Sequence, residues 1–206
     1  MSKQARRRLP NRAARRNDTL AALAAASAAS YADEDESNFT NLTVDRLARR
    51  AGISRASFYI YFEDKAELVR SWHRDLDEQA NTALAQWWPT GPPTPSALRR
   101  ILAQLADIYR ENRAVLSAIQ EMTPHDPLLR QARTDSFTTM REALHQHIAR
   151  GQQEGWSPHD LQPDTTATWI ASMLERVLQH VVPARPDATS LLDTGADIIW
   201  RTLYQP

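Results

Sequence analysis

The chain has 206 residues, 42% of them hydrophobic, and its 25 Lys+Arg balance 25 Asp+Glu to a formal net charge of zero. This length is enough to bury the core of one domain or slightly more. No run of about 18 apolar residues and no cysteine occur, so the sequence argues against a membrane-spanning helix and a disulfide framework, and we expect a cytoplasmic protein.

The neutral average conceals a charge asymmetry along the chain. Residues 1–70 carry 13 Lys+Arg against 9 Asp+Glu, a net +4, while residues 71–206 carry 12 against 16, a net −4. Residues 1–16 alone hold seven positive charges and no negative one. This pattern is typical of a disordered basic arm that contacts a phosphate backbone, and equally of a solvated tail.

Apolar residues recur at helical spacing between clusters of proline, and no strand pattern competes with them. The sequence therefore predicts an all-α fold. Capping residues mark helix starts at Thr94, Asp126 and Asp64, the last with Glu67 three residues later. Nine helices are expected, at roughly 18–31, 43–51, 54–61, 64–88, 95–111, 112–122, 127–151, 163–182 and 188–203.

The segment TVDRLARRAG, residues 43–52, carries an apolar stripe at i, i+3, i+4 and i+7. Thr43 can cap the start of this helix, Gly52 can take the left-handed conformation at its end, and Ser54 can cap the next helix. Two short helices joined by a turn with glycine predict a helix-turn-helix. The pattern alone is weak, because any helical hairpin with glycine in its turn resembles it.

The following segment, GISRASFYIYF at residues 52–62, contains four aromatic rings. At about 100° per residue, Phe58 and Phe62 point together at the core. The outward face consists of Ala56, Ser57 and Ile60, with Tyr59 and Tyr61 on its flanks. We expect this face to enter the major groove of DNA, with the tyrosine hydroxyls on phosphate oxygens.

Two cations lie near this face. Arg55 has the length and the donor fork to bind guanine O6 and N7. Lys65, at the start of the fourth helix, is placed to hold a phosphate together with free backbone N–H groups. The expected DNA contacts are Thr43, Ser54, Arg55, Ala56, Ser57, Tyr59, Ile60, Tyr61 and Lys65.

The stretch LTVDRLARRAGISRASFYIYFEDKAELV, residues 42–69, resembles the DNA-binding segment of the tetracycline-repressor (TetR) family. The residues that carry the resemblance are Thr43, Ala48, Gly52, Ile53, Ser54, Phe58, Tyr59, Tyr61, Phe62, Lys65 and Leu68. The resemblance implies a homodimeric repressor with double-stranded operator DNA as its partner. It also implies a three-helix DNA-binding domain, expected at 17–63 after the disordered basic arm at 1–16, and a six-helix ligand-binding and dimerisation domain at 64–206.

The sequence departs from the family pattern at two places before the helix-turn-helix. The loop after the first helix is long and acidic at residues 33–36, which puts phosphate contacts from that loop in doubt. The arginine-rich arm adds expected contacts to the minor groove or to the DNA backbone.

The predicted helix at 163–182 is apolar on two adjoining faces, more than one core can cover. We expect one face to pack into the domain. The other, with the helix at 188–203, would form a four-helix bundle between two subunits. A helix that is buried on all sides within a monomer is the alternative.

Six tryptophans, concentrated after the helix-turn-helix, suggest an effector pocket between the fourth, fifth, seventh and eighth helices. Its predicted lining is Trp88, Leu102, Leu105, Tyr109, Phe137, Met140, Leu144, Trp169 and Met173. No charged residue belongs to this set, so an apolar or amphipathic effector is expected. Ordinary core packing of the same side chains is the alternative.

No catalytic or metal-binding motif is found in the sequence. His145 and His147 lie two apart on a helix and so on different faces, and neither HExxH, a nucleophile elbow nor a glycine-rich phosphate loop occurs. We therefore predict no metal, no cofactor and no catalysis. The expected function is a repressor released from a palindromic operator by its effector. A helical interaction protein without DNA binding and an enzyme built in the helical bundle remain the alternatives.

Overall fold

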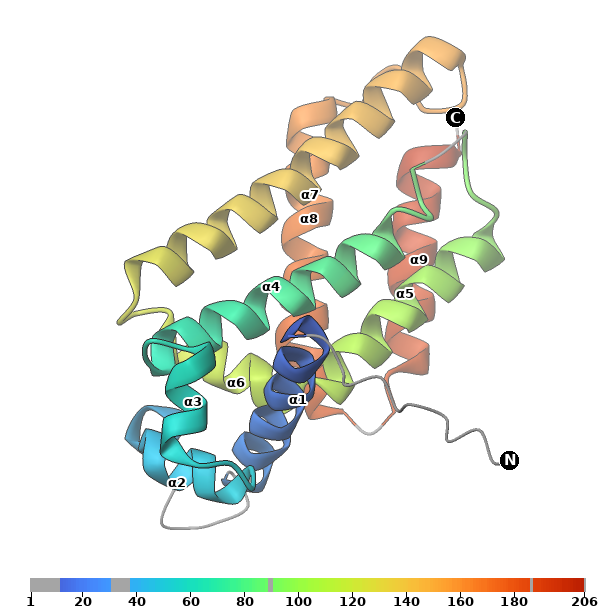
Figure 1. The fold of residues 1–206 in the computed structure, drawn as a ribbon. Coiled ribbons are helices and arrows are strands. Elements are labelled where there is room, and N and C mark those ends of the chain that lie inside the picture. Colours follow the sequence, from blue (N-terminus) through green and yellow to red (C-terminus); the bar gives the residue numbers. More distant parts are fainter. Residues whose placement is uncertain (1–11, 31–37, 89–90, 186, 206) are drawn as a thin grey trace, which may run out of the picture.

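The computed structural model describes residues 12–30, 38–88, 91–185 and 187–205, and the regular structure in these ranges is entirely helical. The prediction of an all-α fold is thereby confirmed (Figure 1). The α-helices are α1 (Arg12–Ser30), α2 (Val44–Arg50), α3 (Arg55–Tyr61), α4 (Lys65–Leu84), α5 (Pro95–Glu111), α6 (Arg113–Met122), α7 (Pro127–Glu154), α8 (Pro163–Arg176) and α9 (Thr189–Tyr204). Within these ranges, no helix is both long and apolar enough to span a membrane.

Two predicted boundaries in the first half of the chain are wrong. Helix α1 begins at Arg12, so residues 12–16 of the predicted disordered arm are helical. Residues 1–11 and the acidic stretch 33–36 lie outside the described residues. Helix α4 ends at Leu84 rather than at 88.

The helix predicted at 163–182 changes its hydrogen-bond pattern near its end. Helix α8 stops at Arg176 and continues as a π-helical turn, η3 (Val177–Val181), and a 3-10 turn, η4 (Val182–Ala184). The cause is Pro183, which has no N–H to donate to the Gln179 carbonyl four residues earlier. The side-chain amide of Gln120 donates to that carbonyl instead, at 3.4 Å.

Side-chain caps hold the helix starts that the sequence marks. The Thr94 hydroxyl accepts from the Ala97 N–H at 3.1 Å, and Asp64 accepts from the Glu67 N–H at 2.7 Å. The Glu67 carboxylate in turn accepts from the N–H of Glu63, the residue before the cap, at 2.6 Å.

Two hydrophobic clusters fill the molecule, and α4 contributes to both. The N-terminal cluster joins α1, α2, α3, the first half of α4 and α6, together with the 3-10 turn η2 (Phe39–Asn41). The C-terminal cluster joins the second half of α4 with α5, α7, α8 and α9. Figure 1 shows α4 running from the end of α3 toward α5 and α9. The residue boundary predicted at 63/64 therefore lies inside the N-terminal cluster.

A hydrogen-bonded aromatic group lies within the C-terminal cluster. The Trp87 indole donates to the Tyr204 hydroxyl at 2.7 Å, and the same hydroxyl lies 2.7 Å from Nε2 of His147. Burial, with a smaller contribution from the neighbouring Arg150, lowers the pKa of His147 to about 4. Among the described residues, no group of three or more His, Asp or Glu could hold a metal ion.

Candidate DNA-binding surface and effector cavity

Helix α3 turns its phenylalanines inward and its opposite face to solvent. Phe58 and Phe62 are fully buried, with ring centroids 5.4 Å apart. On the other side, Ile60 is 63% exposed, Tyr59 is 46% exposed, and Ala56 is exposed as well. The orientation predicted for this helix is confirmed.

The turn between α2 and α3 has the geometry that the sequence predicts. The Thr43 hydroxyl accepts from the Arg46 N–H at 3.3 Å, and the Ser54 hydroxyl accepts from the Ser57 N–H at 3.0 Å. Gly52 lies between them with φ +69°, in the left-handed region that disfavours any side chain. These local contacts fix the angle at which α3 leaves the turn.

Arg55 and the two tyrosines lie at the exposed side of α3. The Arg55 guanidinium carbon lies 5.7 Å from the centroid of the Tyr59 ring, a cation–π arrangement that orients a long side chain before any partner arrives. Tyr61 is half-buried and packs against the N-terminal cluster. Arg55, Tyr59 and Tyr61 therefore remain candidates for DNA contact.

Lys65 is directed into the protein. Its ammonium donates to the carbonyls of Phe39, Thr40 and Leu42 at 2.9, 2.8 and 2.9 Å. Burial lowers the pKa of Lys65, while the nearby Glu121 raises it. All three ammonium donors are engaged, which contradicts the predicted phosphate contact of this side chain. Lys65 instead fastens the turn η2 to the start of α4.

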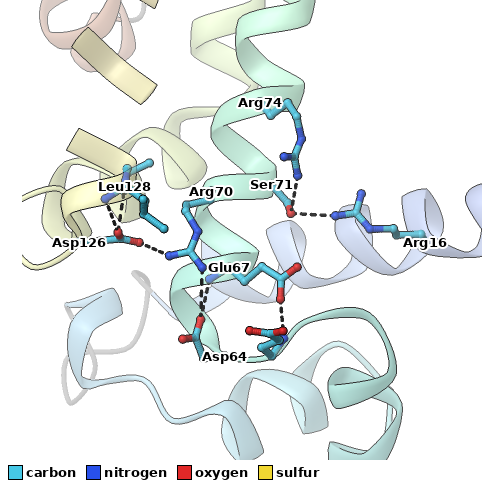
Figure 2. Close-up of polar contacts among 10 residues, drawn as sticks. Arg16, Asp64, Glu67, Arg70, Ser71, Arg74, Asp126 and Leu128 are labelled. Carbon is cyan, nitrogen blue, oxygen red and sulfur yellow. Dashed lines mark hydrogen bonds and ion pairs between the residues drawn. The ribbon is translucent and has the colours of Figure 1, made fainter. Parts of the chain in front are cut away.

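Arg16, which the sequence places in the basic arm, also points inward. Its guanidinium donates to the Ser71 hydroxyl at 2.8 Å and lies 5.4 Å from the centroid of the Phe62 ring. Arg74 donates to the same hydroxyl at 3.1 Å. Figure 2 shows both guanidinium groups converging on Ser71. Arg16 therefore joins α1 to α4 and is withdrawn from the expected set of backbone contacts.

An ion pair connects α4 to the start of α7 (Figure 2). Asp126 is buried and caps α7, since its carboxylate accepts from the N–H groups of Leu128 and Leu129 at 2.9 and 3.2 Å. The other oxygen of Asp126 accepts from Arg70. Burial raises the pKa of Asp126, but the two N–H groups and Arg70 together lower it below its usual value. The Arg70 guanidinium also lies 4.0 Å from Asp64, the cap of α4.

A cavity of about 60 Å³ lies in the region where the effector pocket was predicted. Four of the nine predicted lining residues border it, namely Leu105, Tyr109, Phe137 and Met140. The other lining residues are His73, Leu76, Asp77, Ala80, Asn81, Leu84, Leu116, Ile119, Arg133, Ser136, Leu174, Glu175, Leu178 and Gln179. Three of these carry full charges, contrary to the expectation of an uncharged lining. The sequence pattern identified the apolar stripes of the helices but not the charged residues that flank them.

The other five predicted pocket residues lie elsewhere. Leu144 is buried in the C-terminal cluster, and Trp88 stacks on Trp87 with ring centroids 5.0 Å apart. Leu102 and Met173 line a separate apolar cavity of about 90 Å³ between α5, α8, η3 and α9. Trp169 is 75% exposed and borders neither cavity.

The exposed position of Trp169 follows from the phase of α8. Ile170 and Leu174 are buried in the C-terminal cluster, while Trp169 and Met173 share the adjoining face at i and i+4. Ile198 on α9 is 48% exposed as well. The two helices therefore carry apolar surface beyond what the subunit buries, as the two-faced sequence pattern predicts.

Comparisons with known proteins agree with this arrangement. The family described as "Bacterial regulatory proteins, tetR family" matches residues 35–71. The chain is 29% identical over 62 residues to the HTH-type transcriptional repressor LfrR of Mycolicibacterium smegmatis, a match covering 30% of this chain and 33% of that protein. It is 21% identical over 145 residues to the uncharacterized HTH-type transcriptional regulator YdgC of Bacillus subtilis, covering 68% of this chain and 71% of that one.

The fold of the whole chain has solved counterparts. The TetR-family transcriptional regulator PfmR of Thermus thermophilus superposes with a TM-score of 0.70 at 20% identity, covering 89% of this chain and 99% of that structure. The sequence match to LfrR spans a third of that repressor, whereas the structural match extends over nearly the whole of PfmR. The match to the TetR family model covers α2 and α3, and the likeness to PfmR shows that the helical fold extends beyond that segment.

Proposed function

We propose that the protein is a homodimeric repressor that binds a palindromic operator and releases it when a small molecule enters the cavity beside α4. The observation that carries the proposal is the orientation of α3, whose phenylalanines are buried while Arg55, Ala56 and Ile60 face solvent. A helix of this kind fits the major groove of B-DNA, where base edges are read.

The proposed DNA contacts divide by the chemistry of the side chains. Arg55 donates to guanine O6 and N7 and sets base preference at one position of each half-site. Tyr59 and Tyr61 donate to phosphate oxygens, as do the hydroxyls of Thr43 and Ser54, and these contacts set register rather than sequence. Ala56, Ser57 and Ile60 form the face that approaches the base edges.

The proposed dimer forms through α8 and α9. The support is the apolar surface around Trp169 and Ile198, which the described helices leave exposed. Two copies related by a twofold axis would bury this surface in a four-helix bundle and present two recognition helices. The recognition helices would then bind successive major grooves, about 34 to 36 Å apart.

Effector binding would act on the operator through α4. The cavity lies against the second half of α4, and the Arg70–Asp126 ion pair ties the first half of the same helix to the start of α7. A ligand that separates α4 from α7 would therefore tilt α3 relative to the α3 helix of the other subunit. A coupling of about 1 to 3 kcal/mol suffices for a 5- to 150-fold loss of operator affinity.

Selection of bound genomic fragments, followed by footprinting, tests the proposal. Wild-type protein is expected to protect palindromic sites whose half-sites lie about one helical turn apart, with affinity that falls steeply as salt increases. Arg55→Ala is expected to lose about 1 to 3 kcal/mol of discrimination at one base pair of each half-site. Arg100→Ala, an exposed arginine on α5, is the matched control and should leave the site unchanged.

Two outcomes would contradict the proposal. Unchanged base preference in Arg55→Ala would remove direct readout from α3. Absence of salt-dependent DNA binding by the wild type would favour a helical interaction protein that does not read DNA.

A further inference from the structure

The cavity beside α4 carries an excess of negative charge. Asp77 and Glu175 contribute two carboxylates to its lining, and Arg133 contributes one guanidinium. His73 adds no charge at neutral pH, because burial lowers the pKa of its imidazole. Burial likewise raises the pKa of Tyr109 to about 12 and keeps its hydroxyl neutral.

The single guanidinium is already engaged by neighbours on the same wall. Arg133 donates to the Thr123 hydroxyl and to the Gln179 side-chain oxygen, both at 3.2 Å. It also lies 4.0 Å from the Glu175 carboxylate. Arg133 and Glu175 therefore compensate each other across the gap between α7 and α8.

Asp77 has no such partner. Its carboxylate accepts from the Asn81 side-chain amide at 3.2 Å, and none of the described arginine or lysine side chains forms an ion pair with it. The cavity thus contains one carboxylate whose charge is not neutralised by a cation, facing a space walled by Tyr109, Phe137 and Met140. A half-buried carboxylate in this setting favours an incoming positive charge.

The rest of the wall is suited to the body of such a ligand. Aromatic faces attract cations as well as apolar groups, and methionine adapts to irregular shapes. The present volume of about 60 Å³ is smaller than the roughly 300 Å³ of sites for drug-sized ligands. Entry must therefore displace side chains, and the π-helical turn η3, which contributes Leu178 and Gln179 to the lining, is an irregular wall of the kind often found at functional sites.

We propose that the effector is a cationic amphipathic molecule, with its positive charge next to Asp77 and its apolar body between Tyr109, Phe137 and Met140. This inference rests on the proposed function, since it names the ligand class of the same cavity. It narrows the apolar or amphipathic effector expected from the sequence. An anionic amphiphile would bring its charge beside Asp77 and Glu175, and a neutral one would leave Asp77 without a partner.

A pair of ions of matched size and opposite charge tests the inference. Tetraphenylphosphonium and tetraphenylborate are titrated into the full-length protein by calorimetry. The cation is expected to bind at least about tenfold more tightly, a difference of about 1.4 kcal/mol. Equal affinity for the two ions, tighter binding of the borate, or binding of neither ion would each overturn the proposal.

Two neighbouring substitutions locate the effect. Asp77→Asn keeps the size of the side chain and is expected to weaken phosphonium binding about tenfold without weakening borate binding. Glu78→Gln removes a charge from the next residue of α4, which is exposed and does not line this cavity, and should change neither affinity. An unchanged phosphonium affinity in Asp77→Asn would overturn the assignment.

DNA binding by the same variants separates this inference from the proposed function. Without ligand, both variants should bind wild-type operator fragments with wild-type affinity, because Asp77 lies far along α4 from the exposed face of α3. If wild-type protein binds DNA but prefers the borate, the repressor proposal stands and the cationic ligand class fails. If phosphonium binds through Asp77 but no DNA is bound, the cationic ligand class stands and the repressor proposal fails.

Discussion

Polar side chains in the N-terminal cluster and polar side chains around the cavity differ in how many partners they have. In the N-terminal cluster, polar side chains that cross between elements have several partners each: Lys65 has three carbonyls, and Asp126 has two backbone N–H groups and Arg70. Where the two clusters meet, a cavity of about 60 Å³ is bordered by Asp77, with which none of the described arginine or lysine side chains forms an ion pair.

This difference corresponds to what each region must do. A recognition helix of only seven residues has to be held at one angle by its surroundings, because short isolated helices are marginal in water. A ligand-binding cavity must admit the ligand and convert its binding into a conformational change. This requires space and side chains that can rearrange. The following substitutions test the contrast, ordered by their expected effect on the free energy of unfolding of the subunit.

Phe58→Ala is expected to have the largest effect. The ring is fully buried between α3 and the rest of the N-terminal cluster, and its removal should cost about 3 to 5 kcal/mol in the free energy of unfolding. Ile60→Ala on the opposite face is the matched control, with less than about 0.5 kcal/mol expected. Urea denaturation measures both. A larger loss for Ile60→Ala than for Phe58→Ala would reverse the orientation of α3.

His147 makes the C-terminal cluster sensitive to mild acid. Its folded pKa of about 4 lies below its usual value of 6.5, so the unfolded chain binds more protons between these two values. Stability should therefore fall as the pH decreases through this window, by about 3 kcal/mol at its lower end. His147→Gln, which keeps a polar side chain but does not titrate, should flatten the profile in urea denaturation between pH 7 and pH 4. Parallel profiles for the two proteins would contradict this assignment.

Asp126→Asn tests the junction between α4 and the start of α7. Asparagine can still cap α7 but removes the charged partner of Arg70, so a loss of about 1.5 to 3 kcal/mol is expected at neutral pH. The pKa of Asp126 is lowered in the folded state, so its contribution is present above the usual carboxyl pKa and is lost on further acidification. The difference from wild type should therefore shrink below about pH 4, a lower window than that of His147.

The exposed pair Arg110–Asp107 is the control for this junction. Asp107→Asn removes a carboxylate that lies 2.7 Å from a guanidinium within one helix at the surface. Such pairs contribute little, so a change below about 0.5 kcal/mol is expected. An equal loss in Asp107→Asn and Asp126→Asn would show that burial of the Arg70–Asp126 pair does not matter.

The parts of this structure that could be predicted from sequence are those fixed by neighbours along the chain. The caps at Thr43, Ser54 and Asp64, the turn at Gly52 and the inward face with Phe58 all depend on residues within four positions of each other. Local spacing determines them because a helix repeats every 3.6 residues.

The features that were missed depend on contacts between distant segments. Lys65 meets carbonyls 23 to 26 residues away, and Arg70 meets Asp126 across 56 residues. Nothing in the local pattern distinguishes a lysine that binds carbonyls from one that binds phosphate. The predicted effector pocket matches the observed cavity only in part for the same reason: Tyr109 and Phe137 border this cavity, but whether a large apolar residue such as Trp169 faces inward or outward depends on helix packing.

Trp169→Ala is expected to have the smallest effect on the subunit fold and a selective effect on assembly. The ring is 75% exposed, so its loss should change the free energy of unfolding of the isolated subunit by less than about 0.5 kcal/mol. If α8 and α9 form the dimer, the same ring is an aromatic anchor of that interface, and its truncation should weaken association by about 2 kcal/mol or more.

Leu128→Ala is the control. Leu128 is 66% exposed at the start of α7, and its truncation should leave association unchanged. Sedimentation of wild type and variants over a range of concentrations measures the effect, and a wild-type protein that sediments as a 23.4 kDa monomer at micromolar concentration would refute the dimer itself. The contrast between the variants matters because both remove an exposed apolar side chain, so a loss of association in Trp169→Ala alone cannot come from the removal of exposed apolar surface in general.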